Sequence, residues 1–327
     1  MSNNNSNNNE IDFKSMSYVK GKLFYFLTDM FSEKLNRNAG MTESWSAKDG
    51  KVYKNIKYGS YKRNVYDLYL SNKIQKDKPT KLILFVHGGT WSFGCKNVMS
   101  WACRKYAKHG YITAALSYNL LDRGNRNLSR ASGSKHNATV YDMIEDIDLC
   151  INSVVTRLSK FGYSVSGISL SGESAGSHLS MLYAYSKSET PVPVKMIFTL
   201  TSPVSFQKGA FTLQSDAERA KYVSMLTGVN VTADEIENNN TQITKLLATI
   251  SPTDHISYNS CPTLMGFASK DSLIGPGHYG FIKPVLDKYN IPNDVFWFEN
   301  SDHPLDNDPG RLDDWIALTL KWLEKYM

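Results

Sequence analysis

The sequence has few cysteines and no long apolar run. Its four cysteines show neither a C-x-x-C spacing nor a zinc-ligand spacing; they are Cys95, Cys103, Cys150 and Cys261. A chain of 327 residues builds a core without disulfide bonds, so we expect four reduced thiols and no metal. The apolar run at 23–27 is too short for an export signal or a membrane span. These absences favour a cytoplasmic protein without stable membrane association.

The sequence also lacks a long run of like charges. Lys and Arg number 37 and Asp and Glu 31, which gives a net charge of +6, and the cations are spread along the chain. This distribution argues against a nucleic-acid partner. The apolar fraction of 41% is that of a globular protein. Residues 1–10 are mostly Ser and Asn, and we expect them to form a disordered tail. Composition leaves the oligomeric state open.

Strand-like and helix-like segments alternate along most of the chain. Two β-like stretches at 52–58 and 65–70 predict a hairpin at a sheet edge. Short apolar runs predict strands buried on both faces at 82–86, 112–116, 165–170, 196–200, 263–267 and 295–298. Helical stretches separate most of them, at 98–109, 140–161, 175–186, 278–289 and 312–326. The alternation predicts an α/β protein with a mostly parallel central sheet and helices on both faces, in a single domain over residues 11–327.

Two segments stand outside this alternation. The N-terminal segment 11–45 mixes apolar and charged residues at roughly helical spacing. The segment 205–250 is rich in helix-forming residues and lies between two predicted core strands. We interpret it as an insertion that caps one end of the sheet; a peripheral decoration without a part in substrate binding is the alternative. Its many charged and amide side chains, and the lack of a strongly amphipathic stretch, argue against an apolar lipase lid.

The first indication of chemistry is the G-x-S-x-G sequence Gly172-Glu173-Ser174-Ala175-Gly176. It follows the predicted strand 165–170 and precedes the predicted helix 175–186, which is the strand–turn–helix context of a nucleophile elbow. The glycines let strand and helix approach, so the serine oxygen is exposed at the tip of the turn. The helix N-terminus beside it favours developing negative charge. Ser174 is therefore the predicted nucleophile.

A glycine-containing loop, His87-Gly88-Gly89-Thr90-Trp91, directly follows the predicted strand 82–86. Acyl transfer needs N–H donors aimed at the oxyanion of the tetrahedral intermediate, and glycines let a loop fold back on the nucleophile. The predicted oxyanion donors are the N–H groups of Gly88, Gly89 and Ala175. An ordinary Gly-Gly turn after a strand is the alternative.

A serine nucleophile needs a general base and an acid that orients the base. His303 and Asp271 follow the last two predicted strands, at carboxyl ends where open α/β sheets build their sites. Of the other histidines near these motifs, His255 precedes a strand, His278 opens a predicted helix and His87 is placed to brace the glycine loop. His303 is therefore the predicted base.

Several carboxylates compete as the orienting acid. Asp302 adjoins His303 and would struggle to reach its ring, and Asp254 and Asp306 are placed less well. Asp271 comes between the nucleophile and the base in the chain, directly after the predicted strand 263–267. Asp271 is the predicted acid.

Four motifs together carry a resemblance to a known family: H-G-G-x-W at 87–91, G-E-S-A-G at 172–176, S-K-D at 269–271 and D-H at 302–303. They look like the esterase/lipase branch of the α/β-hydrolase fold, which includes hormone-sensitive-lipase-like and acetyl-esterase-like enzymes. The resemblance runs from about Tyr53 to the C-terminus. It implies the α/β-hydrolase fold, hydrolysis of carboxylic esters without metal or cofactor, and the catalytic roles of Ser174, Asp271 and His303.

The chain departs from the pattern of this family in two places. Thr90 replaces the third glycine of the H-G-G-G form, and H-G-G-x-W resembles kynurenine formamidase-like relatives, which hydrolyse an N-formyl group. The loop 122–137 lacks the proline-rich sequence common in the lipase branch and carries four cations, Arg123, Arg126, Arg130 and Lys135. These cations either attract an anionic substrate or, as we favour, lie on a solvated loop.

The sequence thus predicts a serine esterase that cleaves a small-molecule ester or amide with a small to medium acyl group through an acyl-enzyme. Trp91, Phe93 and Tyr118 flank the motifs and are candidate walls of an acyl pocket, or alternatively core residues. The same groups suit a kynurenine formamidase-like amidase. A non-catalytic hydrolase-fold binding protein is the alternative outside the enzymes, and it would show a broken triad.

Overall fold

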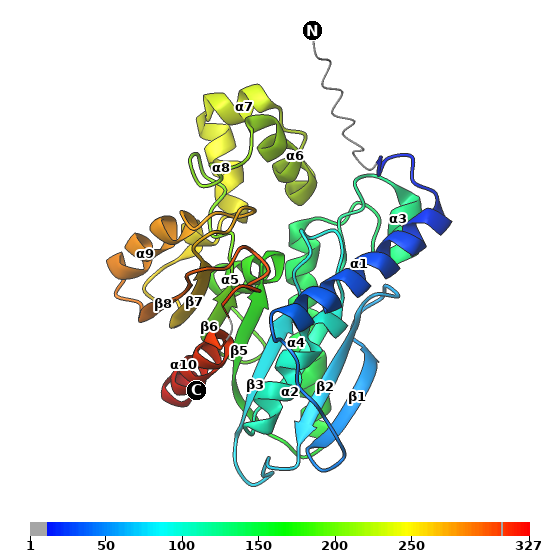
Figure 1. Cartoon of the computed structure of the whole chain (residues 1–327), viewed down its shortest axis with the longest axis vertical. Helices are drawn as coiled ribbons and strands as arrows, with labels where there is room; N and C mark the ends of the chain where they lie inside the picture. Colours follow the sequence, from blue (N-terminus) through cyan, green and yellow to red (C-terminus); the bar gives the residue numbers. More distant parts are fainter. Residues whose placement is uncertain (1–11, 309) are drawn as a thin grey trace.

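A computed structural model describes residues 12–308 and 310–327 (Figure 1). Its centre is an eight-stranded sheet in the order β1-β2-β4-β3-β5-β6-β7-β8. The pairs β1/β2 and β2/β4 are antiparallel, and the other neighbouring pairs of this sheet are parallel. The strands are β1 (Gly50–Lys57), β2 (Val65–Ser71), β3 (Thr80–Val86), β4 (Ile112–Ser117), β5 (Val165–Glu173), β6 (Val194–Leu200), β7 (Thr263–Ala268) and β8 (Asn293–Phe298). The predicted mostly parallel sheet and its edge hairpin are confirmed, whereas the tail expected at 1–10 lies outside the described residues.

Helices cover both faces of the sheet (Figure 1). One face is covered by α2 (Ser100–Lys108), which follows the short 3-10 helix η1 (Lys96–Met99), and by α10 (Arg311–Tyr326). The other is covered by α4 (Val140–Lys160), α5 (Ala175–Ser186) and α9 (His278–Lys288), with the 3-10 helix η2 (Pro252–His255) beside α5. Within β3, Leu82, Leu84 and Val86 join the core under α4 and α5, and Ile83 and Phe85 join the core under α2 and α10. Because successive strand residues point to opposite faces, a strand between two helical layers has to be apolar throughout.

The segment 205–250 folds into three helices, α6 (Asp216–Thr227), α7 (Ala233–Asn238) and α8 (Thr241–Ile250), which form a cap at the top of Figure 1. α8 buries Ile243, Leu247 and Ile250 on one face, so the expectation that this segment has no strongly amphipathic stretch is wrong. These three side chains belong to the main core cluster. The apolar face of α8 is therefore turned inward.

The N-terminal helix α1 (Tyr18–Asn38) crosses the molecule in front of α3 (Arg126–Ser132) (Figure 1). The two helices approach closely at Gly21, where a Cβ atom would lie 3.1 Å from Ala131 Cβ and 3.3 Å from Leu128 Cδ2. Any larger residue at 21 would push α1 away from α3. The close packing at Gly21 holds α1 against the body of the protein.

The segment 122–137 contains the short helix α3, and its cations Arg126 and Arg130 are exposed to solvent, as we favoured from the sequence. Asn125 caps this helix by accepting the N–H of Asn127, and Gly133 ends it at φ 78°. The cations make local contacts: Arg123 lies over the ring of Phe13, 3.8 Å from its centroid, and Lys135 pairs with an aspartate of α4. Asn125 and Gly133, a favourable N-cap and C-cap that enclose seven residues in a polar stretch, were the sequence signal for this helix.

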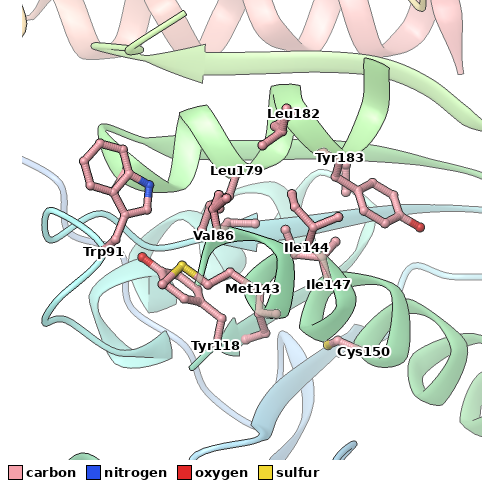
Figure 2. Packing of buried hydrophobic residues seen from close by; sticks show 14 of the residues in the cluster. Val86, Trp91, Tyr118, Met143, Ile144, Ile147, Cys150, Leu179, Leu182 and Tyr183 are labelled. Carbon is pink, nitrogen blue, oxygen red and sulfur yellow. The ribbon is translucent and has the colours of Figure 1, made fainter. Parts of the chain in front are cut away.

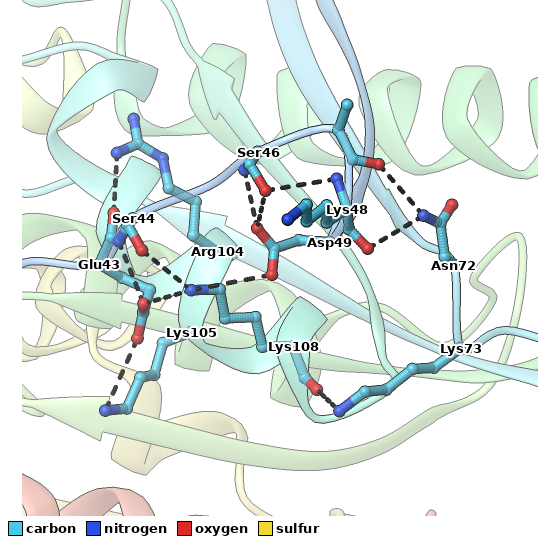
Figure 3. A network of polar contacts seen from close by, with 11 residues as sticks. Glu43, Ser44, Ser46, Lys48, Asp49, Asn72, Lys73, Arg104, Lys105 and Lys108 are labelled. Carbon is cyan, nitrogen blue, oxygen red and sulfur yellow. Dashed lines mark hydrogen bonds and ion pairs between the residues drawn. The ribbon is translucent and has the colours of Figure 1, made fainter.

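A polar network ties the segment after α1 to α2 (Figure 3). Lys108 Nζ lies 2.7 Å from Glu43 Oε1 and Lys105 Nζ 3.7 Å from Glu43 Oε2, while Arg104 Nη1 donates to the Glu43 carbonyl at 3.0 Å. The N-terminal segment is thus fastened at α3 and again at α2.

The four cysteines are free thiols. None of the helices in the described part of the chain has both the length and the hydropathy of a membrane-spanning segment.

Asp146 of α4 links two loops beside the antiparallel edge, and its removal is predicted to destabilise the fold. Its carboxyl group accepts Asn64 Nδ2 at 2.9 Å, Asn119 N at 2.6 Å and Asn119 Nδ2 at 2.8 Å. We expect Asp146→Ala to lower the free energy of unfolding by about 3 kcal/mol, because it leaves buried N–H groups without an acceptor. Urea denaturation measures this, with the exposed Glu145→Ala on the same helix as the control. Equal stability of the two variants would contradict the prediction.

Candidate active site

Ser174 lies at the turn between β5 and α5, where the sequence placed a nucleophile. Its backbone has φ 51° and ψ −122°, and its N–H donates to the Leu200 carbonyl at 2.9 Å. A Cβ atom on Gly172 would lie 2.5 Å from the carbonyl carbon of Gly176, and one on Gly176 would lie 2.0 Å from Val86 O. Both glycines are therefore required for β3, β5 and α5 to meet, and the packed elements hold the serine in its strained conformation.

The carboxylate of Asp271 and the imidazole of His303 are hydrogen-bonded to each other. His303 Nδ1 lies 2.8 Å from Asp271 Oδ2. The two residues follow β7 and β8, which are parallel neighbours, so their carboxyl ends bring them together. The second carboxylate oxygen, Asp271 Oδ1, accepts the N–H of Leu273 at 2.9 Å and that of Ile274 at 2.8 Å. These bonds fix the carboxylate from the side away from the imidazole.

The ionisation of Asp271 follows from its surroundings. Burial raises the pKa of Asp271, but the hydrogen bond and charge of His303, together with the two backbone N–H groups, outweigh it and leave that pKa below its ordinary value. Asp271 is therefore ionised at neutral pH. A carboxylate at Nδ1 holds the proton on that nitrogen and leaves Nε2 as the basic atom of His303.

The second carboxylate near His303 is engaged elsewhere. Asp302 Oδ1 accepts the Ser272 N–H at 2.7 Å and the backbone N–H of His303 at 2.7 Å, and both its oxygens receive the Ser272 hydroxyl. Asp271 therefore contacts the imidazole of His303, whereas Asp302 contacts Ser272 and the backbone N–H of His303. Glu173 was not among the residues predicted from the sequence, yet it lines a pocket together with His303. Burial raises the pKa of the Glu173 carboxyl group, and the nearby His303 offsets only part of this rise.

Ser174 borders two pockets. We call the first the open pocket; it has a volume of about 380 Å³, and Ser174, His303, Gly88 and Gly89 all line it, with Phe31 of α1 on another side. We call the second the cap pocket; it has a volume of about 40 Å³ and lies between Ser174 and the cap. Cap-segment residues line it: Phe206, Phe211, Gln214, Arg219, Tyr222 and Val223. The cap segment is thus a wall of the site, and a decoration remote from Ser174 is excluded.

The glycine loop runs directly beside Ser174. A Cβ atom on Gly88 would lie 3.0 Å from Glu173 O and 3.4 Å from Ser174 Cβ. Gly89 has φ 112°, and the left-handed conformation continues through Thr90 at 44° and Trp91 at 58°. Ala175 is the first residue of α5, so its N–H has no carbonyl partner within that helix. The three predicted oxyanion donors therefore belong to backbone that meets at the nucleophile.

Gly89 provides a test of this loop. A Cβ atom there would lie 2.3 Å from Phe93 O, at a φ that other residues avoid. Gly89→Ala keeps the N–H group, but the clash has to move the loop and carry this donor out of place. We therefore expect kcat/KM to fall by about 10²–10³-fold, the usual effect of losing an oxyanion donor. Gly280→Ala is the matched control, because its Cβ enters open space on α9 at an ordinary φ. Steady-state kinetics with a p-nitrophenyl ester measures both, and equal rates for the two variants would contradict the role given to the loop.

His87 braces the loop, as the sequence indicated. Its Nδ1 donates to the Gly88 carbonyl at 2.7 Å, and burial together with the charge of Arg63 lowers its pKa to about 3. The ring of Tyr118 stacks on His87 with centroids 4.3 Å apart and donates its hydroxyl to the His87 carbonyl at 3.0 Å. Tyr118 is fully buried among hydrophobic side chains (Figure 2). It lines neither of the two pockets at Ser174. It is a core residue behind the loop, not a wall of an acyl pocket.

Trp91 does line the cap pocket, and a histidine that the sequence did not reveal positions it. Trp91 Nε1 donates to His178 Nδ1 at 3.1 Å, and His178 Nε2 donates to the Ile250 carbonyl at 2.7 Å. Burial lowers the pKa of His178 to about 4, so the ring is neutral and its two nitrogens have opposite roles. The available signal was the position of His178, one helical turn after Ser174. Phe93, the other aromatic candidate, lines the open pocket.

The remaining candidates do not line either pocket at Ser174. The four cations of the 122–137 loop line neither pocket, so an anionic substrate at Ser174 would not meet them. His278 begins α9, as expected, and its Nδ1 accepts the Val204 N–H at 3.2 Å. Among the described residues, no group of three or more His, Cys, Asp or Glu side chains is arranged to hold a metal ion.

The sheet order and the placement of the elbow define the α/β-hydrolase fold, and solved esterases share it. Esterase B from Lactobacillus rhamnosis superimposes with a TM-score of 0.66 at 16% identity, over 94% of this chain and 95% of that one. A truncated carbohydrate esterase from gut microbiota gives 0.65 at 15% identity, over 86% and 100%. Propionate-bound Est2 of Thermogutta terrifontis gives 0.63 at 18% identity, over 85% and 94%. At such identities the likeness concerns the fold.

Within this fold, the chain belongs to the BD-FAE family, whose sequence profile matches residues 66–278. That range contains the glycine loop, the elbow, the cap and Asp271, and it ends before His303. The expected membership of an esterase branch of the α/β-hydrolases is thereby confirmed.

Curated relatives match over a shorter stretch. Isoprenylcysteine alpha-carbonyl methylesterase of Arabidopsis thaliana is 33% identical over 128 residues, which are 39% of this chain and 26% of that protein. Kynurenine formamidase of Salmo salar is 25% identical over 128 residues, 39% of this chain and 37% of that protein. The matched region thus spans 26% of the first relative and 37% of the second.

Proposed function

We propose that this protein is a serine hydrolase that cleaves carboxylic esters of small to medium acyl groups. The observation that carries the proposal is the bond of His303 to an ionised Asp271, in a pocket that His303 shares with the elbow serine. An imidazole oriented by a carboxylate activates a serine hydroxyl once the two approach each other, and both residues line this pocket, although no hydrogen bond joins them in the described structure. A binding protein built on the same fold would need neither the paired acid nor the strained elbow.

The proposed reaction proceeds in two halves. Ser174 Oγ attacks the ester carbonyl while His303 Nε2 takes its proton, and the N–H groups of Gly88, Gly89 and Ala175 receive the negative oxygen. Collapse breaks the ester C–O bond as His303 returns the proton to the leaving alcohol. Water, deprotonated by His303, then attacks the acyl-enzyme, and the second collapse releases the carboxylic acid and restores the Ser174 hydroxyl. Asp271 holds the imidazole in place throughout.

The two pockets divide the substrate between them. The leaving alcohol must lie near His303 to receive its proton, and His303 lines the open pocket. The acyl chain then occupies the cap pocket, whose walls include Trp91, Phe206 and Phe211. An open pocket on the alcohol side accommodates leaving groups of varied size, and the small cap pocket favours short acyl chains.

The names of the curated relatives suggest two more specific substrates, a methyl ester and a formamide. Both have a small group on one side of the scissile bond. We propose the ester because the methylesterase of Arabidopsis thaliana is 33% identical to the matched segment of this chain, whereas the formamidase of Salmo salar is 25% identical.

The test is hydrolysis of p-nitrophenyl acetate, butyrate and octanoate, with N-formylkynurenine alongside. We expect acetate and butyrate esters to be cleaved with a higher kcat/KM than the octanoate. A higher kcat/KM for N-formylkynurenine than for every ester would assign the protein to the amidases. A folded protein that cleaves none of the four would contradict the proposal.

A further inference from the structure

Two residues that line the cap pocket each have one buried polar atom without a hydrogen-bond partner among residues 12–308 and 310–327: Arg219 Nη2 and Gln214 Oε1. Arg219 is only 8% exposed, and its other terminal nitrogen donates to Asp216 Oδ1 at 2.8 Å. Gln214 Nε2 donates to the Leu273 carbonyl at 2.7 Å, which fixes the amide and leaves Oε1 as the free acceptor. Buried polar atoms of native proteins are nearly always paired, so two in one pocket point to a ligand.

The surroundings of these two atoms are apolar. Trp91, Phe206, Phe211 and Val223 line the same pocket, and Ser174 lies in its wall. An acyl chain attached to Ser174 would extend toward Arg219 and Gln214 through apolar surroundings. A purely apolar chain would leave both polar atoms unsatisfied.

The two free atoms have complementary hydrogen-bonding roles. Arg219 Nη2 is a donor and requires an acceptor, and Gln214 Oε1 is an acceptor and requires a donor. A carboxylate would satisfy the guanidinium but would turn its lone pairs toward Gln214. A carboxamide or a hydroxyl group supplies an acceptor and a donor together.

We propose that the cap pocket selects short acyl groups whose far end carries a carboxamide or hydroxyl group, with Arg219 donating to it and Gln214 accepting from it. This inference rests on the proposed ester hydrolysis and names the substrate class for it. Arg219 and Gln214 are specificity residues; the bonds made and broken at Ser174 are those already described.

The experiment compares methyl esters that share a skeleton and differ at the far end. Methyl succinamate, methyl 4-methylpentanoate and monomethyl succinate place a carboxamide, an isopropyl group and a carboxylate at the same position. The malonate and glutarate series shift that position by one methylene in each direction. Methanol release measures kcat/KM for all of them. At the best chain length we expect the carboxamide to exceed its apolar isostere by at least about tenfold, because a site built for hydrogen bonds rejects the analogue that lacks them.

Two variants assign this preference to the residues. Arg219→Met and Gln214→Met keep much of each side-chain volume, and each is expected to lower the ratio of carboxamide to isopropyl kcat/KM by about tenfold. Lys245→Met, an exposed cation on α8 of the same cap, is the control and keeps the wild-type ratio. A thermal melt verifies that each variant is folded, and the two variants test the same preference from different elements.

Each result has one interpretation. A wild-type preference for the isopropyl ester at all three lengths, or a ratio unchanged in both variants, overturns the inference. A preference for the carboxylate over the carboxamide overturns the role of Gln214. Cleavage of the isopropyl esters that depends on Ser174 keeps the hydrolase proposal even then. Failure to cleave any ester, with Ser174 unlabelled by a fluorophosphonate, overturns both.

Discussion

Ser174→Ala is expected to abolish hydrolysis, with kcat/KM falling by about 10⁴–10⁶-fold on p-nitrophenyl butyrate. The loss is this large because the elbow presents one oxygen to the substrate carbonyl, and the residual rate comes from the oxyanion donors and binding alone. The alanine has no hydroxyl for His303 to deprotonate. The fold should persist, because the elbow geometry is held by Gly172, Gly176 and the packed helix.

The measurement is a set of initial rates for wild type, Ser174→Ala and Ser186→Ala. Ser186 lies on the same helix α5, is exposed and bonds only to the carbonyl of its preceding turn, so its loss should leave the rate within about twofold. A fluorophosphonate probe adds a covalent readout, labelling wild type and Ser186→Ala but not Ser174→Ala. Hydrolysis that survives in Ser174→Ala would show that another group is the nucleophile.

Asp271→Asn is expected to lower kcat by about 10³–10⁴-fold, as at the corresponding acid of a serine protease. The substitution preserves size, but an amide no longer supplies the charge that keeps the proton on His303 Nδ1. The imidazole would then present the wrong tautomer to Ser174. The two backbone N–H groups at Asp271 Oδ1 can still be accepted by the amide oxygen, so stability should change much less than activity.

Asp302→Asn is the comparison that makes this result specific. Its side chain accepts backbone and hydroxyl donors of 272 and 303 rather than the imidazole, so we expect less than about a tenfold loss of kcat. The two aspartates lie in the same pair of loops, and general damage to these loops would lower both variants alike. A larger loss for Asp302→Asn than for Asp271→Asn would reverse the assignment of the acid.

The sheet and the four motif segments were predictable from sequence for a common reason. Strands covered on both faces favour continuous apolar runs, as in β3, and such runs are visible without structural knowledge. The polar segments that directly follow them must lie at the carboxyl edge, where Ser174, Asp271 and His303 are found. Strand order places these residues in one region, although their roles stay predictions until the variants are measured.

The rest depended on contacts between segments far apart in the chain. Tyr118 directly follows β4, a position from which we predicted that it lines the acyl pocket. Its ring instead stacks on His87, which places it in the core. In the sequence, His178 is only a histidine within a predicted helix. Its part in positioning Trp91 follows from its hydrogen bonds to Trp91 and to the Ile250 carbonyl, which come from distant segments. The polar atoms in the cap pocket are visible only once the cap is folded over Ser174, because nothing local in the sequence brings 214 and 219 to that serine.

The strained backbone at Ser174 couples the stability of the fold to the residue at the proposed nucleophile position. Its φ of 51° with ψ −122° costs a non-glycine residue about 1–3 kcal/mol, and glycine adopts it more readily. Ser174→Gly would therefore remove the hydroxyl and relieve the backbone strain in one substitution, so thermal stability and the proposed reactivity are opposed at this position.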